Sequence, residues 1–247
     1  NSRSLNLDNV AAEQALSQAE TSNRTRMEGG VMSSASNDRE WKMLLVLAVT
    51  YLAAEGRAEA RVTDGSIQEK LNFDPRLLEQ LMLLLHNLGR ATAGGGRSIQ
   101  IHQDGIATVE RFLQQLFRDH GAAEAKSSGF GQHIALWQRL EWERYRVWKA
   151  IYDGSGGMPD VPVTFAKITA ASELSLDDMF RAIDFLEHNG LTQYPFTQNV
   201  VLTYAGCTGF EAFQDELEGA EVAPTDSEAF GSYLERRLCQ GSVSGEK

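Results

Sequence analysis

The side chains best suited to recognise nucleic acid lie between positions 76 and 97. Arginine, asparagine and glutamine hydrogen-bond to phosphates and base edges, and a helix that enters the major groove needs them on its exposed face. The segment offers five such residues, three on an expected helix and two on the hairpin after it: Arg76, Gln80, Asn87, Arg90 and Arg97. These are the candidate DNA contacts, although the helix itself carries only one base.

No combination of residues predicts an enzyme. The stretch "DGSGG" at 153–157 resembles a serine-protease fragment, but no histidine or aspartate supports it. There is no phosphate-loop signature and no His-Glu-x-x-His motif. The five histidines are scattered, and Cys207 and Cys239 lack metal-ligand spacing. We therefore expect no catalytic residue, no metal site and no cofactor.

The amino-acid composition limits the kinds of partner that the protein can bind. The 247-residue chain has a formal net charge of −11, which argues against broad electrostatic capture of DNA or of an anionic membrane. The longest apolar run, 43–54, is too short to cross a bilayer. Two unpatterned cysteines suit a reducing compartment, so we expect a protein of the cytoplasm, nucleoid or nucleus.

The chain repeats itself with a shift of 101 residues, without a gap from Glu40 to Phe112. Identical residues coincide along this register, and apolar character is kept at many other positions. The identical pairs include Trp41 with Trp142, Tyr51 with Tyr152, Gly89 with Gly190, Gly105 with Gly206, and Glu110 with Glu211. The sequence thus indicates two copies of one design.

Each copy predicts the same order of elements. A long helix (39–54; 136–152) precedes a short one that Thr63 or Thr164 caps. A third helix follows, capped by Asp74 or by Ser175, and ends at a glycine. Two short strands (90–93 and 98–102; 191–194 and 199–204) and a further helix complete the copy.

This order resembles the winged-helix superfamily. The endings "IQIHQDGIATVERFL" and "VVLTYAGCTGFEAFQ" are similar to its wing-strand tail, although His102 stands where threonine is usual. The resemblance covers residues 38–118 and 134–216 and implies a mainly α protein with small β-hairpin wings, built as two tandem winged-helix domains. We expect 1–37 to be a flexible segment with a short helix, 119–133 a linker, and 217–247 an acidic segment with a terminal helix.

The third helix of the second copy suits DNA poorly. Its expected outward positions are Asp177, Arg181, Asp184 and His188, and residues 175–189 hold four acids against one arginine. The second wing, 191–204, carries no charge. We expect exposed residues here and on the first third helix to contact a protein partner or a second copy: Leu83, Asp177, Arg181, Asp184, Tyr194 and Phe196.

A basic-aromatic strip at 137–152, "WQRLEWERYRVWKAIY", has two interpretations. Interleaved aromatic and basic residues can bind nucleic acid, but a core helix would use the same aromatics for packing. The second interpretation is favoured, because glutamates offset part of the positive charge.

Two functions follow from the resemblance. One is a non-enzymatic interaction or assembly subunit, similar in architecture to the winged-helix partners of SMC–kleisin complexes (the segregation and condensation protein B and MukE types) or to ESCRT-II subunits. The alternative is a DNA-binding transcription regulator that uses the third helix and wing of the first domain. The charge of the two third helices favours the first.

Overall fold

The computed structural model describes residues 34–58, 60–94, 97–196, 198–220 and 224–240, with side chains from Asp38 onward except those of Pro195, Phe196 and Gln240. The chain divides into two compact units. Unit 1 comprises the residues up to Leu136 together with those after Arg237, and unit 2 runs from Trp137 to Arg237. The expected helix near residues 7–16 lies outside the described residues.

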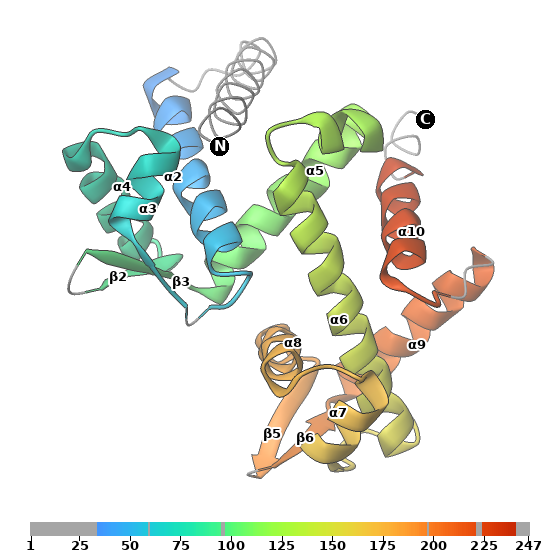
Figure 1. Ribbon diagram of the computed structural model, residues 1–247. Helices are drawn as coiled ribbons and strands as arrows, with labels where there is room; N and C mark the ends of the chain where they lie inside the picture. The colour runs from blue at the N-terminus through green and yellow to red at the C-terminus, as the bar shows by residue number, and fades with distance from the viewer. Residues whose placement is uncertain (1–33, 59, 95–96, 197, 221–223, 241–247) are drawn as a thin grey trace, which may run out of the picture. The chain divides into compact units, whose positions relative to one another are not determined.

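Unit 1 consists of helices around one small sheet (Figure 1). Its elements are α2 (Ser34–Ala53), β1 (Arg61–Thr63), α3 (Asp64–Leu71), α4 (Pro75–Asn87), β2 (Ala91–Gly94), β3 (Ser98–Ile101) and α5 (Gln103–Ser127). The strands form an antiparallel sheet in the order β1-β3-β2. Helix α6 (Gly131–Ser155) begins in unit 1 and continues into unit 2.

Unit 2 repeats this order. After α6 come β4 (Val163–Thr164), α7 (Phe165–Ser172), α8 (Leu176–His188), β5 (Thr192–Phe196), β6 (Asn199–Leu202) and α9 (Tyr204–Gly219), followed by α10 (Ser227–Gln240). Its sheet is antiparallel with the order β4-β6-β5. The expectation of a mainly α protein with small β-hairpins is therefore confirmed.

Contacts recur in the two units at positions 101 residues apart. The Tyr51 hydroxyl donates to Glu110 at 3.2 Å in unit 1, and the Tyr152 hydroxyl donates to Glu211 at 2.9 Å in unit 2. Each bond joins the first helix of its unit to the helix that follows the hairpin. The residues after α3 and α7, Asn72 and Glu173, are both left-handed, with φ of 50° and 51°.

The helices are capped by the residues that the sequence predicted. Thr63 and Thr164 accept hydrogen bonds from the first turns of α3 and α7, as expected. Asp74 caps α4, with Pro75 in its first turn, and Ser175 caps α8. Gly89 and Gly190 have φ of +67° and +71°, a conformation that favours glycine and ends both helices.

A second pair of equivalent glycines, Gly105 and Gly206, lies too close to a backbone carbonyl for a residue with a Cβ atom. A Cβ at Gly105 would collide with the Arg90 carbonyl oxygen, and one at Gly206 with that of Leu191. At the same junction Thr203 donates to the Gly190 carbonyl at 2.7 Å, while His102 Nδ1 lies 3.0 Å from the Gly89 carbonyl. The histidine thus makes the contact that the threonine makes in unit 2, although its residue type departs from the expected pattern.

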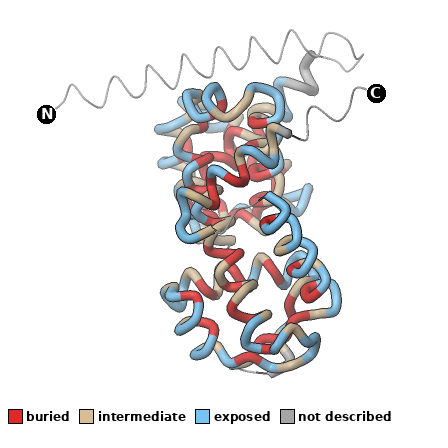
Figure 2. The backbone as a smooth tube through the Cα atoms, turned by 90° about the vertical axis from the view of Figure 1, so that its right-hand side faces the viewer, coloured by how far each residue is buried: buried red, intermediate tan, exposed pale blue. Residues whose placement is uncertain are grey.

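Each unit has its own core (Figure 2). In unit 1 the first helix, α4, the sheet and α5 all contribute fully buried residues: Leu47, Leu85, Ile99, Ile101 and Val109. In unit 2 the matching elements contribute Val147, Ile183, Leu186, Val200 and Phe210. The alternation expected for the second strands, Ile99 with Ile101 and Val200 with Leu202, places all four side chains in these cores.

Three features differ from the sequence expectation. Strands β1 and β4 were not expected, because three and two residues are too short to show a period. Helix α2 begins at Ser34, inside the segment expected to be flexible. The segment expected as a linker, 119–133, is largely helical: α5 continues to Ser127 across a kink at Gly121, whose φ is 78°.

A buried histidine lies in unit 1. His133 is 8% exposed, and its ring centroid lies 5.3 Å from that of Phe130. Burial lowers the pKa of His133 from 6.5 to about 4; the Ala48 backbone opposes this shift, and the charge of Lys70 adds to it. The imidazole is therefore neutral in the folded protein at neutral pH.

We predict that His133 makes the stability of unit 1 depend on pH. Its contribution is complete well above pH 6.5, because neither the folded nor the unfolded state is protonated there. As the pH falls from 6.5 towards 4, only the unfolded state takes up the proton, so stability is lost. The free energy of unfolding should fall by about 2 kcal/mol between pH 6.5 and 5, measured by urea denaturation. The variant His133→Phe should remove this loss; an unchanged slope would contradict the prediction.

Candidate interaction surfaces

The outer face of α4 is one exposed stripe. Leu78, Leu81, Met82 and Leu85 are buried, which confirms the expected inner face. Arg76, Gln80, Leu83 and Asn87 are all exposed, and their spacing of four, three and four residues places them along one side of the helix. Leu83, at the middle of this stripe, is 57% exposed. We call these four residues the α4 stripe.

The two remaining candidate DNA contacts are on the hairpin after α4. Arg90 is half-buried and directly precedes β2, while Arg97 is exposed in the β2–β3 turn. Arg97 has a φ of 59°, and its carbonyl accepts a hydrogen bond from the Asp64 amide at 2.9 Å. The turn is thereby joined to the N-terminus of α3.

The matching face of α8 is acidic. Asp177, Asp184 and His188 are exposed at positions that correspond to Arg76, Leu83 and Asn87. Residues 74–101 hold three bases and two acids, a net charge of +1, whereas 175–202 hold one base and four acids, a net charge of −3. The two units therefore present opposite charge at equivalent places.

Arg181 is not an outward residue, contrary to the sequence expectation. Its side chain is only 8% exposed and pairs with Glu143 of α6 at 2.5 Å and with Asp178 at 2.7 Å. Helical spacing placed Arg181 on the outer side of α8, but two carboxylates draw its guanidinium inward. It joins α8 to α6 rather than offering a cation to a partner.

Tyr194 joins the second hairpin to α8. Its hydroxyl donates to Asp184 at 3.2 Å, and its ring lies 6.1 Å from that of Phe165. Burial and then the neighbouring Asp184 charge raise the pKa of Tyr194, so the hydroxyl remains a donor. Tyr194 is thus half-buried rather than a free anchor, and the side chain of Phe196 lies outside the described residues.

The basic-aromatic strip of α6 is a packing surface. Trp137 is 2% exposed and Tyr145 is 9% exposed. Arg144 pairs with Glu141 at 2.5 Å, and its guanidinium lies 3.4 Å from the centroid of the Phe185 ring. Every base of the strip has a carboxylate partner, the others being Arg139 with Glu143, Arg146 with Glu173, and Lys149 with Asp153.

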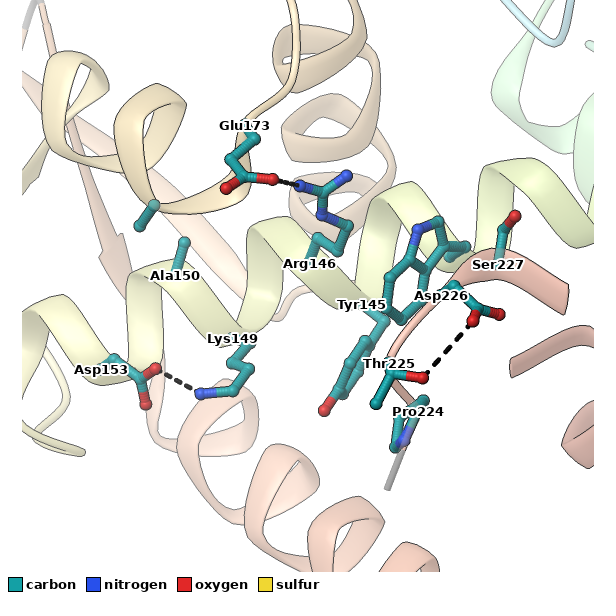
Figure 3. Close-up of a pocket in the computed structure, with 12 residues that line it drawn as sticks. Tyr145, Arg146, Lys149, Ala150, Asp153, Glu173, Pro224, Thr225, Asp226 and Ser227 are labelled. Atoms are coloured by element: carbon teal, nitrogen blue, oxygen red, sulfur yellow. Dashed lines mark hydrogen bonds and ion pairs between the residues drawn. The ribbon is translucent and has the colours of Figure 1, made fainter. Parts of the chain in front are cut away.

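Unit 2 also contains a cleft that the sequence did not indicate (Figure 3). Its volume is about 530 Å³, and its lining residues come from α6, the end of α7 and 224–227. Trp142 and Tyr145 form an aromatic wall with their rings stacked 5.6 Å apart. Arg146 and Lys149 project from the same helix, each paired with an exposed carboxylate. No sequence motif joins residues so far apart along the chain.

Within the described ranges no three histidine, cysteine or acidic side chains are grouped so that they could hold a metal ion. No helix in the same part of the chain is long and apolar enough to cross a membrane. Comparisons of the chain with protein-family models, with curated proteins and with solved structures gave no match.

We predict that Glu143 stabilises unit 2 by neutralising Arg181. The variant Glu143→Ala leaves a buried guanidinium without one of its carboxylates and should lower the free energy of unfolding by about 3 kcal/mol. The matched control is Arg139→Gln, which removes a half-exposed base from the same carboxylate, 3.7 Å away, and should cost less than about 1 kcal/mol. Equal small losses in urea denaturation would show that Arg181 does not depend on Glu143.

Proposed function

We propose that each unit is a winged helix and that the protein is a non-enzymatic interaction subunit of a larger, DNA-associated or protein-only assembly. The order of three helices, a hairpin and a further helix in both units supports this. So does the three-stranded sheet, in which the short strand before the second helix pairs with the last strand of the hairpin. In a winged helix, α4 and α8 are the third helices and the two hairpins are the wings.

The observation that carries the proposal is the exposed Leu83 at the centre of the α4 stripe. A helix that reads bases needs polar or basic side chains there, whereas a protein interface gains free energy by burying an apolar side chain within a polar rim. Arg76, Gln80 and Asn87 supply such a rim along the stripe. Leu88, beyond the end of α4, is also 53% exposed and adds apolar area beside it.

The net negative charge of unit 2 also supports a role in binding protein. Residues 137–237 contain eight basic and seventeen acidic residues, a net charge of −9, so this unit carries most of the −11 of the chain. Its third helix would set Asp177 and Asp184 against phosphates, which Coulomb repulsion disfavours. We therefore propose that unit 2 contributes to the assembly without reading DNA.

The test is quantitative affinity purification from the source cells with three forms of the full chain. Leu83→Asp should reduce recovery of the specific partner at least tenfold, because it places a charge at the centre of the interface. Gln132→Asp introduces the same charge at an exposed position of α6 and should leave recovery unchanged. Equal recovery with all three forms would refute binding through the α4 stripe.

DNA binding by unit 1 is the second candidate. It is favoured by Arg76, Gln80 and Asn87 sharing one exposed face, with Arg97 exposed on the adjoining hairpin. The negative charge of unit 2 and the exposed apolar side chain of Leu83 argue against DNA binding. A regulator would use this face on its own or as a dimer.

Fluorescence anisotropy of a mixed-sequence duplex, at about 50 and 200 mM salt, separates the two functions. A regulator should bind tightly at low salt, weaken steeply at high salt, and lose binding with Arg90→Glu/Arg97→Glu. The matched control, Arg111→Glu/Arg118→Glu, changes the same charge at exposed positions of α5 and should keep binding. The interaction subunit that we propose should show no such binding by any form.

A further inference from the structure

In each unit a phenylalanine from farther along the chain packs against aromatic side chains of the first helix and of the helix after the hairpin, which we call the aromatic groove. In unit 1 the groove is formed by Trp41 of α2 and Phe112 of α5, whose ring centroids lie 5.7 Å apart. Phe130, just before α6, fills it, with centroid distances of 6.2 Å to Trp41 and 5.0 Å to Phe112. The side chain of Phe130 is 5% exposed, so this contact is dry.

The groove of unit 2 uses the equivalent residues, but here Tyr145 contacts both of them, with ring centroids 5.6 Å from Trp142 and 5.9 Å from Phe213. Trp142 and Phe213 stand 101 residues after Trp41 and Phe112. Phe230 of α10 fills this groove, with centroid distances of 5.4 Å to Trp142 and 6.2 Å to Phe213. The interplanar angle between Phe112 and Phe130 is 68°, and that between Phe213 and Phe230 is also 68°. Tyr145 adds a further stacked ring 5.2 Å from Phe230.

The two covering helices share a short sequence. Residues 130–134 read Phe-Gly-Gln-His-Ile, and residues 230–234 read Phe-Gly-Ser-Tyr-Leu. Burial matches at both ends of the motif: the first, fourth and fifth residues are buried in each copy, and the third is exposed. The spacing is 100 residues rather than 101, so the motif stands outside the gapless repeat. The pattern Phe-Gly-x-aromatic-aliphatic is therefore present twice, with the same side chains buried.

Beyond the motif the two helices diverge. Leu136 and Trp137 of α6 are buried, and α6 continues into unit 2. The matching positions of α10, Arg236 and Arg237, are exposed. Arg237 pairs with Glu216 at 2.7 Å, and Glu235 accepts a hydrogen bond from Gln138 at 2.6 Å. Helix α10 thus keeps the docking residues of α6 without the buried residues that lead into another unit.

We infer that the groove of unit 2 is a binding site for a helix with the Phe-Gly-x-aromatic-aliphatic motif, and that α10 of the same chain is its occupant. Unit 1 uses the equivalent groove to hold the start of α6. In unit 2 the same recognition holds a separate helix, which covers Trp142 and Phe213. This inference goes beyond the proposed function and does not depend on the α4 stripe.

The experiment uses the full chain with Phe230→Asp, which places a carboxylate in the aromatic groove and expels α10. A labelled peptide of residues 227–240 should bind this variant. It should not bind the natural chain, because tethered α10 has an effective concentration in the millimolar range. A peptide with the unit 1 motif, Phe-Gly-Gln-His-Ile, should bind within about tenfold of the natural peptide, and one with alanine for phenylalanine at least about tenfold more weakly. Absence of peptide binding to a folded Phe230→Asp chain would overturn the inference.

A second variant decides the question if Phe230→Asp does not fold. The full chain with Ser232→Gln, Tyr233→His and Leu234→Ile carries the unit 1 motif on α10. Its urea midpoint, followed by tryptophan fluorescence, should stay close to that of the natural chain, whereas Phe230→Ala should lower it clearly. A transplanted motif that lowers the midpoint as much as Phe230→Ala would show that the two grooves are not equivalent.

Discussion

The contact between a tryptophan of the first helix and a phenylalanine from beyond the helix that follows the hairpin is the constraint that both units share. The first helix of each unit packs against α4 or α8 and the small sheet, and its tryptophan, Trp41 or Trp142, lies half-buried. Phe130 and Phe230 pack against these tryptophans. Without this contact more of the tryptophan surface would face water, which costs free energy in proportion to the apolar area exposed.

The two units share the design of their cores and differ in their outer faces. Equivalent tyrosine–glutamate bonds, caps and left-handed residues maintain the same frame in each. On this frame α4 exposes a leucine among polar residues, whereas α8 exposes acids and draws its arginine into an internal ion pair. One unit therefore offers an apolar contact, and the other contributes negative charge.

Sequence reasoning predicted what depends on neighbours along the chain. Capping by Thr63 and Asp74, the inner face of α4, and the ends of both third helices at Gly89 and Gly190 follow from local rules, and the structure confirms them. Strands of two or three residues show no period, so β1 and β4 were missed. The exposed face of α4 was predictable from helical spacing, and all four residues of the stripe are exposed.

The features that the sequence did not predict depend on contacts between residues that are far apart along the chain. The position of Arg181 is decided by Glu143, 38 residues earlier, and helical spacing carries no record of that partner. The docking motif escaped notice because it has only five residues and its shift differs from 101 by one. The cleft beside Trp142 joins α6 to residues near 225, which no motif connects. Tertiary contacts of this kind are set by packing rather than by local pattern.

The most direct measurement is photo-crosslinking in the source cells from a photoreactive amino acid placed at position 83, followed by identification of what is attached. Our account predicts that the adducts join the α4 stripe to a protein, and that the same amino acid at position 132 gives none to that protein. Adducts formed mainly with nucleic acid would contradict it and would make this chain a DNA-binding regulator.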